Sequence, residues 1–275
     1  MSTSSPLSLD HLVIHVKDLA AAVAQYTALG FTVQDGGTHA DGNTHNALIG
    51  FADGSYLELI AFLKPAASHR WGRHQQSGYE GFVDFALLPH DVSQVVQRAQ
   101  AQGLNYQGPI EGGRLRPDGE RLVWQLGIPP TPDLPFLCGD VTPRALRVRE
   151  GEVRVHANGV QGVAALTLVV RDLATSLAHY LALLGAAEPL LGPTVLSGLG
   201  IEQAVLSLGT QRLVLLAPVA DADTAPARSL QHLLDTRGEG VLGASLRLGA
   251  GHPATSTHAL PLAATHGAPF EWTPA

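Results

Sequence analysis

The amino-acid sequence predicts an α+β fold built from tandem βαβββ units. Three observations predict it: an internal repeat, an alternation of β-prone and helical stretches, and frequent turn residues. Of the 275 residues 45% are hydrophobic and 15% charged, so the chain can bury a substantial core. Its 30 glycines and 18 prolines are expected where short strands are joined by many turns.

The repeat becomes visible when residues 9–19 are aligned with residues 163–173. Both copies have an apolar, β-branched run, then an aspartate, then an alanine- and leucine-rich stretch that ends near a glycine. This order predicts a strand, a helix N-cap, a helix and a C-cap, with the first helix over 19–29. Three β-prone runs follow at 31–34, 46–51 and 55–62, and Asp53-Gly54 is a strong hairpin signal between the last two.

A second unit begins at residue 81, where Asp91 precedes a helical run over 92–102. The strands expected after this helix are 105–109, 121–126 and 134–138. A fourth and shortest unit begins near 240–248. Four units form two paired domains, which we expect at 7–140 and 160–275, joined by a charged linker over 141–159.

Composition and charge exclude several classes of partner. The net charge is −7 and no run of lysine or arginine occurs, so nucleic acid is not an expected partner. The longest apolar stretch, 163–187, is interrupted by Arg171, Asp172 and His179, so no membrane span is expected. Residues 1–6 resemble no secretory signal and Cys138 has no disulfide partner, so we expect a cytoplasmic protein. A small molecule is the expected ligand.

Short motifs in the first 140 residues resemble the vicinal oxygen chelate superfamily, and within it the glyoxalase-like domain branch. The motifs are Leu9-Asp10-His11-Leu12, Gly36-Gly37-x-His39, Thr44-x-Asn46, Tyr56-Leu57-Glu58-Leu59, Arg116-Pro-Asp-Gly119 with Trp124, and His156-x-Asn158-Gly159. One departure is Asn43, where the branch usually has glycine. The resemblance implies that paired βαβββ units form half-barrel domains, and that metal ligands come from the first and fourth strands of each unit.

Side chains alternate across a strand, which directs His11 and Glu58 into the cup of the first domain. Asp84 takes the position of His11 in the second unit, inside an apolar strand where an unpaired charge is costly. The resemblance implies that His11, Glu58 and Asp84 bind a divalent metal ion. One histidine and two carboxylates suit zinc, manganese or magnesium better than iron. The alternative is that no metal is bound, and that His11 and Glu58 form a buried pair that ties two strands together.

Other residues of the first domain are candidates for catalysis or substrate binding. Glu58 or His15 would shuttle a proton. The expected substrate-binding residues are His39, Asn46, Tyr56, Arg114 and Trp124. In the second domain, Ala165 and Leu213 occupy the positions of His11 and Glu58 and cannot bind a metal, so this domain is expected to be degenerate.

The resemblance implies a metal-dependent enzyme that acts on a small oxygenated molecule without redox change, as a lyase, isomerase or hydrolase. The alternative is a protein that binds or sequesters a small molecule without a reaction, as the bleomycin resistance proteins of the superfamily do. A homodimer stays an open alternative to a monomer.

Overall fold

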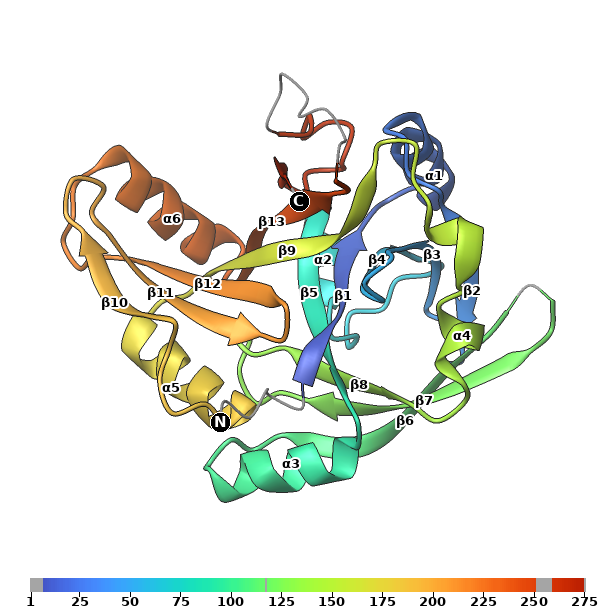
Figure 1. Ribbon diagram of the computed structural model, residues 1–275, viewed down its shortest axis with the longest axis horizontal. Coiled ribbons are helices and arrows are strands. Elements are labelled where there is room, and N and C mark those ends of the chain that lie inside the picture. Colours follow the sequence, from blue (N-terminus) through green and yellow to red (C-terminus); the bar gives the residue numbers. More distant parts are fainter. Residues whose placement is uncertain (1–6, 117, 251–258, 275) are drawn as a thin grey trace.

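The computed structural model describes residues 7–116, 118–250 and 259–274. Two sheets form the molecule, a closed barrel of eight strands and an open sheet of six strands (Figure 1). The α+β class and the tandem βαβββ arrangement are confirmed. Residues 1–6, and Pro117 of the Arg116 motif, lie outside the described residues.

The barrel contains the first two units in the strand order β1-β4-β3-β2-β6-β7-β8-β5. The first unit consists of β1 (Leu7–His15), α1 (Leu19–Ala28), β2 (Gln34–His39), β3 (Thr44–Gly50) and β4 (Tyr56–Phe62). A short helix, α2 (Gly72–Ser77), leads to the second unit, which consists of β5 (Gly81–Pro89), α3 (Val92–Ala101), β6 (Gln107–Leu115), β7 (Arg121–Ile128) and β8 (Phe136–Asp140). The two units are joined through the antiparallel pair β1 and β5, while β4 and β8 run parallel to these strands.

The open sheet has the order β10-β11-β12-β9-β13-β14. Its strands and helices are β9 (Val160–Val169), α5 (Leu173–Leu184), β10 (Leu191–Leu196), β11 (Ile201–Leu208), β12 (Gln211–Pro218), α6 (Ala225–Thr236), β13 (Gly240–Leu248) and β14 (Phe270–Thr273). The segment before it, 141–159, carries α4 (Arg144–Arg147) and a short 3₁₀ turn at Gly151–Arg154.

Helix starts follow the sequence pattern closely. Asp18, Asp91 and Asp172 each accept a hydrogen bond from a backbone N–H three residues later, which satisfies a donor that the helix itself leaves unpaired. Gly185 ends α5 with a positive φ of 64°, where a glycine avoids strain. The same local chemistry thus starts the helix in three of the repeated units.

The expected strand at 31–34 is wrong, because β2 begins only at Gln34. Phe31 is buried in the core, and the Thr32 backbone N–H and hydroxyl bond to the segment that follows α4. The partners are His156 Nδ1 at 3.0 Å and the Val155 carbonyl at 2.6 Å. This stretch therefore binds residues 155–156 instead of joining the sheet.

The second sheet is open, and among the described residues its last unit contributes β13 and β14 alone. The two helices α5 and α6 lie on opposite faces of this sheet (Figure 1). On the face that corresponds to the barrel interior, Leu230 and Leu234 of α6 pack against Val169 and Leu216. A helix therefore occupies the hollow of the open sheet.

Strand register corrects one detail of the repeat. Val214 pairs with Thr167 in the open sheet, as Glu58 pairs with Val13 in the barrel. Val214, and not Leu213, therefore takes the position of Glu58, while Leu213 belongs to the core under α5. The conclusion that this position cannot bind a metal is unchanged.

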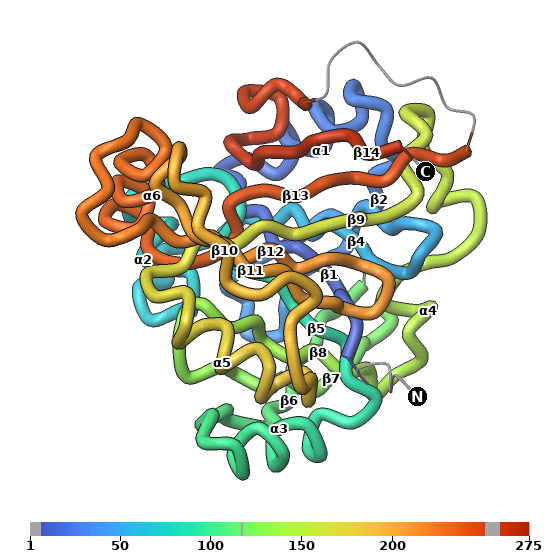
Figure 2. Tube along the Cα trace, turned by 60° about the vertical axis from the view of Figure 1, so that its left-hand side comes forward, coloured from blue at the N-terminus to red at the C-terminus, as the bar shows by residue number. Residues whose placement is uncertain are grey.

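The two sheets share one hydrophobic core. The rings of Phe82 in β5 and Phe270 in β14 meet edge to face, with centroids 5.1 Å apart. The Tyr26 hydroxyl of α1 donates to the Thr265 carbonyl at 3.1 Å, so the C-terminal segment lies against α1 (Figure 2). The barrel and the open sheet thus pack through a continuous apolar interface.

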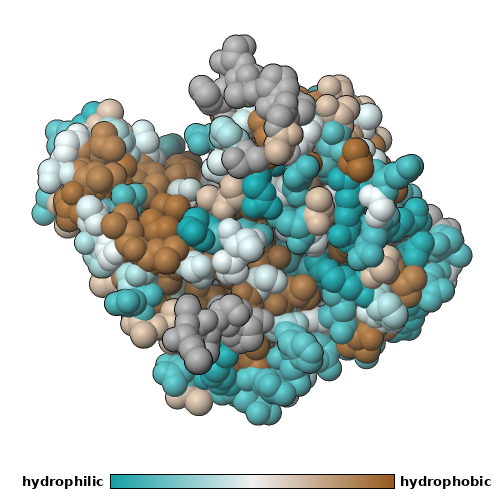
Figure 3. Space-filling view, in the orientation of Figure 1, coloured by the Kyte–Doolittle hydropathy of each residue, from teal (hydrophilic) through white to brown (hydrophobic). Residues whose placement is uncertain are grey.

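Apolar side chains gather on the surface of the open sheet, around β10 and α6 (Figure 3). Exposed members are Leu190, Leu191, Val195 and Leu199. No helix among the described residues is long and apolar enough to cross a membrane.

Leu57→Ala should lower the free energy of unfolding by about 2–5 kcal/mol, because the Leu57 side chain is fully buried in the core and its loss leaves a cavity. Leu63→Ala is the matched control: Leu63 is 51% exposed, and its loss should change stability by less than about 0.5 kcal/mol. Urea denaturation measures both values, and equal effects of the two substitutions would contradict the described packing.

Candidate active site

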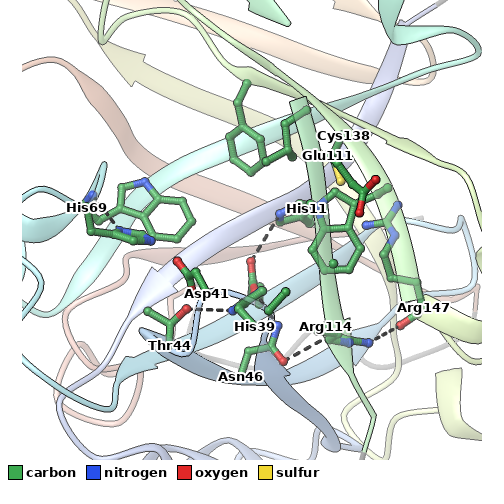
Figure 4. Close-up of a pocket in the computed structure, with 18 of the residues that line it drawn as sticks. His11, His39, Asp41, Thr44, Asn46, His69, Glu111, Arg114, Cys138 and Arg147 are labelled. Carbon is green, nitrogen blue, oxygen red and sulfur yellow. Dashed lines mark hydrogen bonds and ion pairs between the residues drawn. The ribbon is translucent and has the colours of Figure 1, made fainter. Parts of the chain in front are cut away.

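A cavity of about 280 Å³ lies inside the barrel. Residues of both units surround it, and Arg147 reaches it from α4 (Figure 4). Its aromatic walls are formed by Tyr56, Trp71, Trp124 and Phe136. Its polar groups include His11, His39, Asp41, Thr44, Asn46, Glu58, His69, Glu111, Arg114 and Arg121.

His11 and Glu58 face each other across β1 and β4, as strand alternation predicts. His11 Nε2 lies 3.4 Å from Glu58 Oε2, and both side chains are buried. The His11 ring stacks on Tyr56, with centroids 4.5 Å apart and an angle of 19° between the planes. On the other side, His11 Nδ1–H donates to the Asp10 carboxylate at 2.8 Å. This bond directs Nε2 toward Glu58.

Asp10 connects the site to α4. Arg147 binds Asp10 at 2.9 Å, Asp140 at 2.5 Å and the Tyr56 hydroxyl at 2.7 Å, and Arg144 binds Asp10 at 2.6 Å. Burial opposes ionisation of Asp10, but Arg147, His11 and Arg144 outweigh it and hold the Asp10 pKa far below its ordinary value. Asp10 is therefore a buried carboxylate with three cationic neighbours.

The surroundings of His11 favour its protonated form. Burial acts to lower its pKa, but the hydrogen bond to Asp10 and the negative charges of Asp10 and Glu58 raise the pKa above the ordinary 6.5. Burial likewise acts to raise the pKa of Glu58, but His11, His39 and Asn46 lower it to about 2. His11 thus lies between two carboxylates inside the barrel.

The pKa of His39 is shifted in the opposite direction to that of His11. Its Nε2 lies 3.5 Å from Glu58 Oε1, its Nδ1 lies 2.8 Å from Thr44 Oγ1, and Trp124 meets its ring edge to face. Burial lowers the pKa of His39, and the positive charges of Arg114 and His11 add to this shift against the attraction of Glu58. Two histidines with opposite shifts therefore flank the two oxygens of one carboxylate.

Asp84 does not join His11 and Glu58, which corrects the expected ligand set. The register pairs His11 with Ala86 and Val13 with Asp84, so Asp84 does occupy the position equivalent to His11. Its carboxylate instead accepts from Arg70 Nε at 2.5 Å and Trp71 Nε1 at 2.9 Å, and it borders a separate cavity. A nearby cation and an indole N–H already satisfy its charge.

The fourth expected ligand position also lacks a ligand. Because Phe136 pairs with Ala86 as Glu58 pairs with Val13, Phe136 is the equivalent of Glu58 in the second unit. Cys138, two residues later, borders the cavity, but burial raises its thiol pKa well above the ordinary value. Within 7–116, 118–250 and 259–274 no three His, Cys, Asp or Glu side chains are arranged to hold a metal ion. The residues present therefore do not fit the expected three-ligand metal site.

His15 is also absent from the cavity. Its Nδ1 lies 2.6 Å from the Tyr79 carbonyl, and its ring packs edge to face on Phe62. Phe62 in turn contacts His69, which does line the cavity. His15 thus lies beyond Phe62 at the end of β1, outside the residues that line the cavity.

The predicted substrate-binding residues all line the cavity: His39, Asn46, Tyr56, Arg114 and Trp124. Asn46 Nδ2 donates to Glu58 at 2.5 Å, so it also positions that carboxylate. Sequence reasoning missed Arg147 and Asp10, although Asp10 belongs to the motif that contains His11. It also missed Trp71, which the Asp84 hydrogen bond holds against the cavity.

Comparisons with known proteins agree with this architecture. A family model described as a glyoxalase-like domain matches residues 9–184, which include α4 and the first strand and helix of the second sheet. No curated protein matches in sequence.

Solved structures are similar in fold. A hypothetical protein from Staphylococcus aureus has a TM-score of 0.69 at 14% identity, with 98% of this chain and 99% of that chain covered. A mutant 4-hydroxymandelate synthase from Streptomyces coelicolor has a TM-score of 0.62 at 15% identity, with 89% and 71% covered. At these identities the likeness concerns the fold alone.

The depressed pKa of Glu58 predicts how acid destabilises the protein. Protonation favours the unfolded chain, because the Glu58 pKa is about 2 when folded and near 4.5 when unfolded. The contribution of Glu58 is therefore complete above pH 4.5 and is lost as the pH falls toward 2, by roughly 3 kcal/mol. Denaturant unfolding across this range should show a shallower loss in Glu58→Gln than in wild type.

The control is Glu188→Gln, which removes an exposed carboxylate from the second domain. Its unfolding free energy should fall with decreasing pH as steeply as that of wild type. If the unfolding free energy of Glu58→Gln fell with pH as steeply as that of wild type, the described contacts of Glu58 would be contradicted.

Proposed function

The chain belongs to the glyoxalase-like domain family, and on this premise we propose that it is an enzyme that moves a proton within a small oxygenated molecule, without redox change. The molecule binds in the barrel cavity beside His11, His39 and Glu58. One observation supports this most strongly: the two histidines meet the same carboxylate at 3.4 Å and 3.5 Å, with pKa values shifted in opposite directions. Titratable groups whose pKa values are pushed apart mark acid and base roles.

His39 is the base in this proposal and His11 the acid. The proton of a C–H bond next to a carbonyl passes to His39 Nε2, and the electron pair of that bond moves onto the carbonyl oxygen. The imidazolium of His11 donates to this developing oxyanion, with its positive charge held by Asp10. Return of the proton to a different carbon, or to the other face, completes an isomerisation.

Glu58 orients the two imidazoles. Both of its contacts with the histidines are longer than the roughly 3.2 Å of an ordinary N–H···O bond, so each Nε2 remains able to meet a substrate. Asn46 holds the carboxylate in place between the two rings. The proposal routes no step through a divalent ion, because Asp84 and Phe136 leave only His11 and Glu58 at the expected ligand positions.

Binding without reaction is the second candidate. The aromatic walls of the cavity, and its place inside the barrel, would serve sequestration equally well. Proton exchange separates the two candidates, because a protein that only sequesters its ligand needs no acid–base pair.

Wild-type protein in deuterium oxide should exchange a carbon-bound proton of at least one member of a panel of small carbonyl acids, as followed by proton NMR. His39→Gln and His11→Gln should each slow this exchange by about 10²-fold or more, because each removes one of the two proton-transfer groups. His90→Gln, at an exposed position outside the cavity, should exchange at the wild-type rate. Ligand binding without any exchange would support sequestration and contradict the proposal.

The pH profile of the exchange rate should be bell-shaped. The rate rises as His39 loses its proton, below pH 6.5, and falls as His11 loses its proton, above pH 6.5. Asp10→Asn should move the falling limb to lower pH, since it removes a charge that raises the His11 pKa. A falling limb that does not move would rule out His11 as the acid.

A further inference from the structure

Three arginines line the cavity, and they differ in their partners. Arg147 binds the carboxylates of Asp10 and Asp140, and Arg121 pairs with Glu111 at 3.4 Å. Arg114 has no carboxylate at ion-pair distance among the described residues. It is the arginine whose charge the cavity leaves without a counter-ion.

The guanidinium of Arg114 is nonetheless deeply buried, since the residue is 4% exposed. Two of its N–H groups donate to neutral oxygens, one to Asn46 Oδ1 at 3.3 Å and one to the Arg147 carbonyl at 2.7 Å (Figure 4). Its Nε is buried with no hydrogen-bond partner among the described residues. Burial of a cation without a paired anion is costly, so a ligand that supplies the anion would bind favourably.

Glu58 does not serve as that anion. The amide of Asn46 separates the two side chains, since its Nδ2 donates to Glu58 and its Oδ1 accepts from Arg114. The negative charge of Glu58 already lies against His11, whose protonated form it favours. The cavity around Arg114, His11 and Glu58 therefore favours an added negative charge.

The rest of the cavity is suited to a flat apolar group. Trp71, Trp124 and Phe136 supply aromatic faces and edges, and Leu126 adds an aliphatic one. A volume of about 280 Å³ is near the small end of ligand pockets, which start at about 300 Å³. A molecule with one ring fits this size better than a larger one.

The geometry points to a small aromatic carboxylate as the ligand, with its carboxylate on Arg114 and its ring against Trp71, Trp124 and Phe136. The guanidinium offers a planar pair of donors that matches a carboxylate. This inference names the substrate class for the proposed function and rests on it for the reaction, whereas binding itself requires no proton transfer.

Calorimetry with matched probes tests the inference. Benzoate and phenylacetate carry the carboxylate, and benzamide and phenylacetamide are their neutral counterparts of similar shape. Wild type should bind each carboxylate at least tenfold more tightly than its amide. Arg114→Met should weaken carboxylate binding by about 10- to 100-fold, the range for a hydrogen bond to a charged group, and should leave amide binding unchanged.

Arg149→Met is the control, because Arg149 is an exposed arginine outside the cavity. It should bind all four probes as wild type does. Arg114→Lys retains the charge without the planar fork, and should keep a weaker preference for the carboxylates.

Two results would overturn the inference: wild type that binds carboxylates and amides equally or binds neither, or folded Arg114→Met that keeps the carboxylate preference. The ratio of carboxylate affinity to amide affinity in wild type tests the inference even if Arg114→Met does not fold. Because these measurements need no turnover, a carboxylate preference without proton exchange would reject the proposed reaction and leave the ligand class standing.

Discussion

The buried carboxylate of Asp10 is the contact on which the rest of the site depends. It joins β1 to α4 through Arg144 and Arg147, and it holds His11 toward Glu58. Removal of one partner from such a buried pair typically costs about 3–5 kcal/mol, because the other charge is left without compensation. The segment 141–159, expected as a linker, therefore contributes Arg147 to the lining of the cavity and binds Asp10, whose charge raises the pKa of His11. The contacts of Asp10 thus connect the stability of the barrel with the protonation of His11.

The barrel is built from two similar units, yet its polar groups are distributed unequally. The first unit supplies His11, His39 and Glu58, while the second supplies Phe136 at the position of Glu58 and an Asp84 neutralised by Arg70. Trp124 and Phe136 of the cavity lining come from the second unit, whereas His11, His39 and Glu58 come from the first. This asymmetry distinguishes the cavity from a symmetric metal site, which would need ligands from both units.

The second sheet shows what happens when a unit is shortened. The inner face of the open sheet carries Val169 and Leu216, and Leu230 and Leu234 of α6 cover them. The hollow that holds polar groups in the barrel is filled by apolar packing here. The shared core then fixes the two sheets against each other.

Local signals in the sequence determined the repeated units, the helix starts at Asp18, Asp91 and Asp172, and the inward direction of His11 and Glu58, because capping and strand alternation act over a few residues. The sequence also predicted His39, Asn46, Tyr56, Arg114 and Trp124 as binding residues, and all five line the cavity. Only the tertiary structure decided that Asp84 pairs with Arg70, that His15 lies behind Phe62, and that Arg147 binds Asp10. Each of these contacts joins residues that are separated in the sequence. Which charged or aromatic side chain lies next to a given residue depends on how the whole barrel folds.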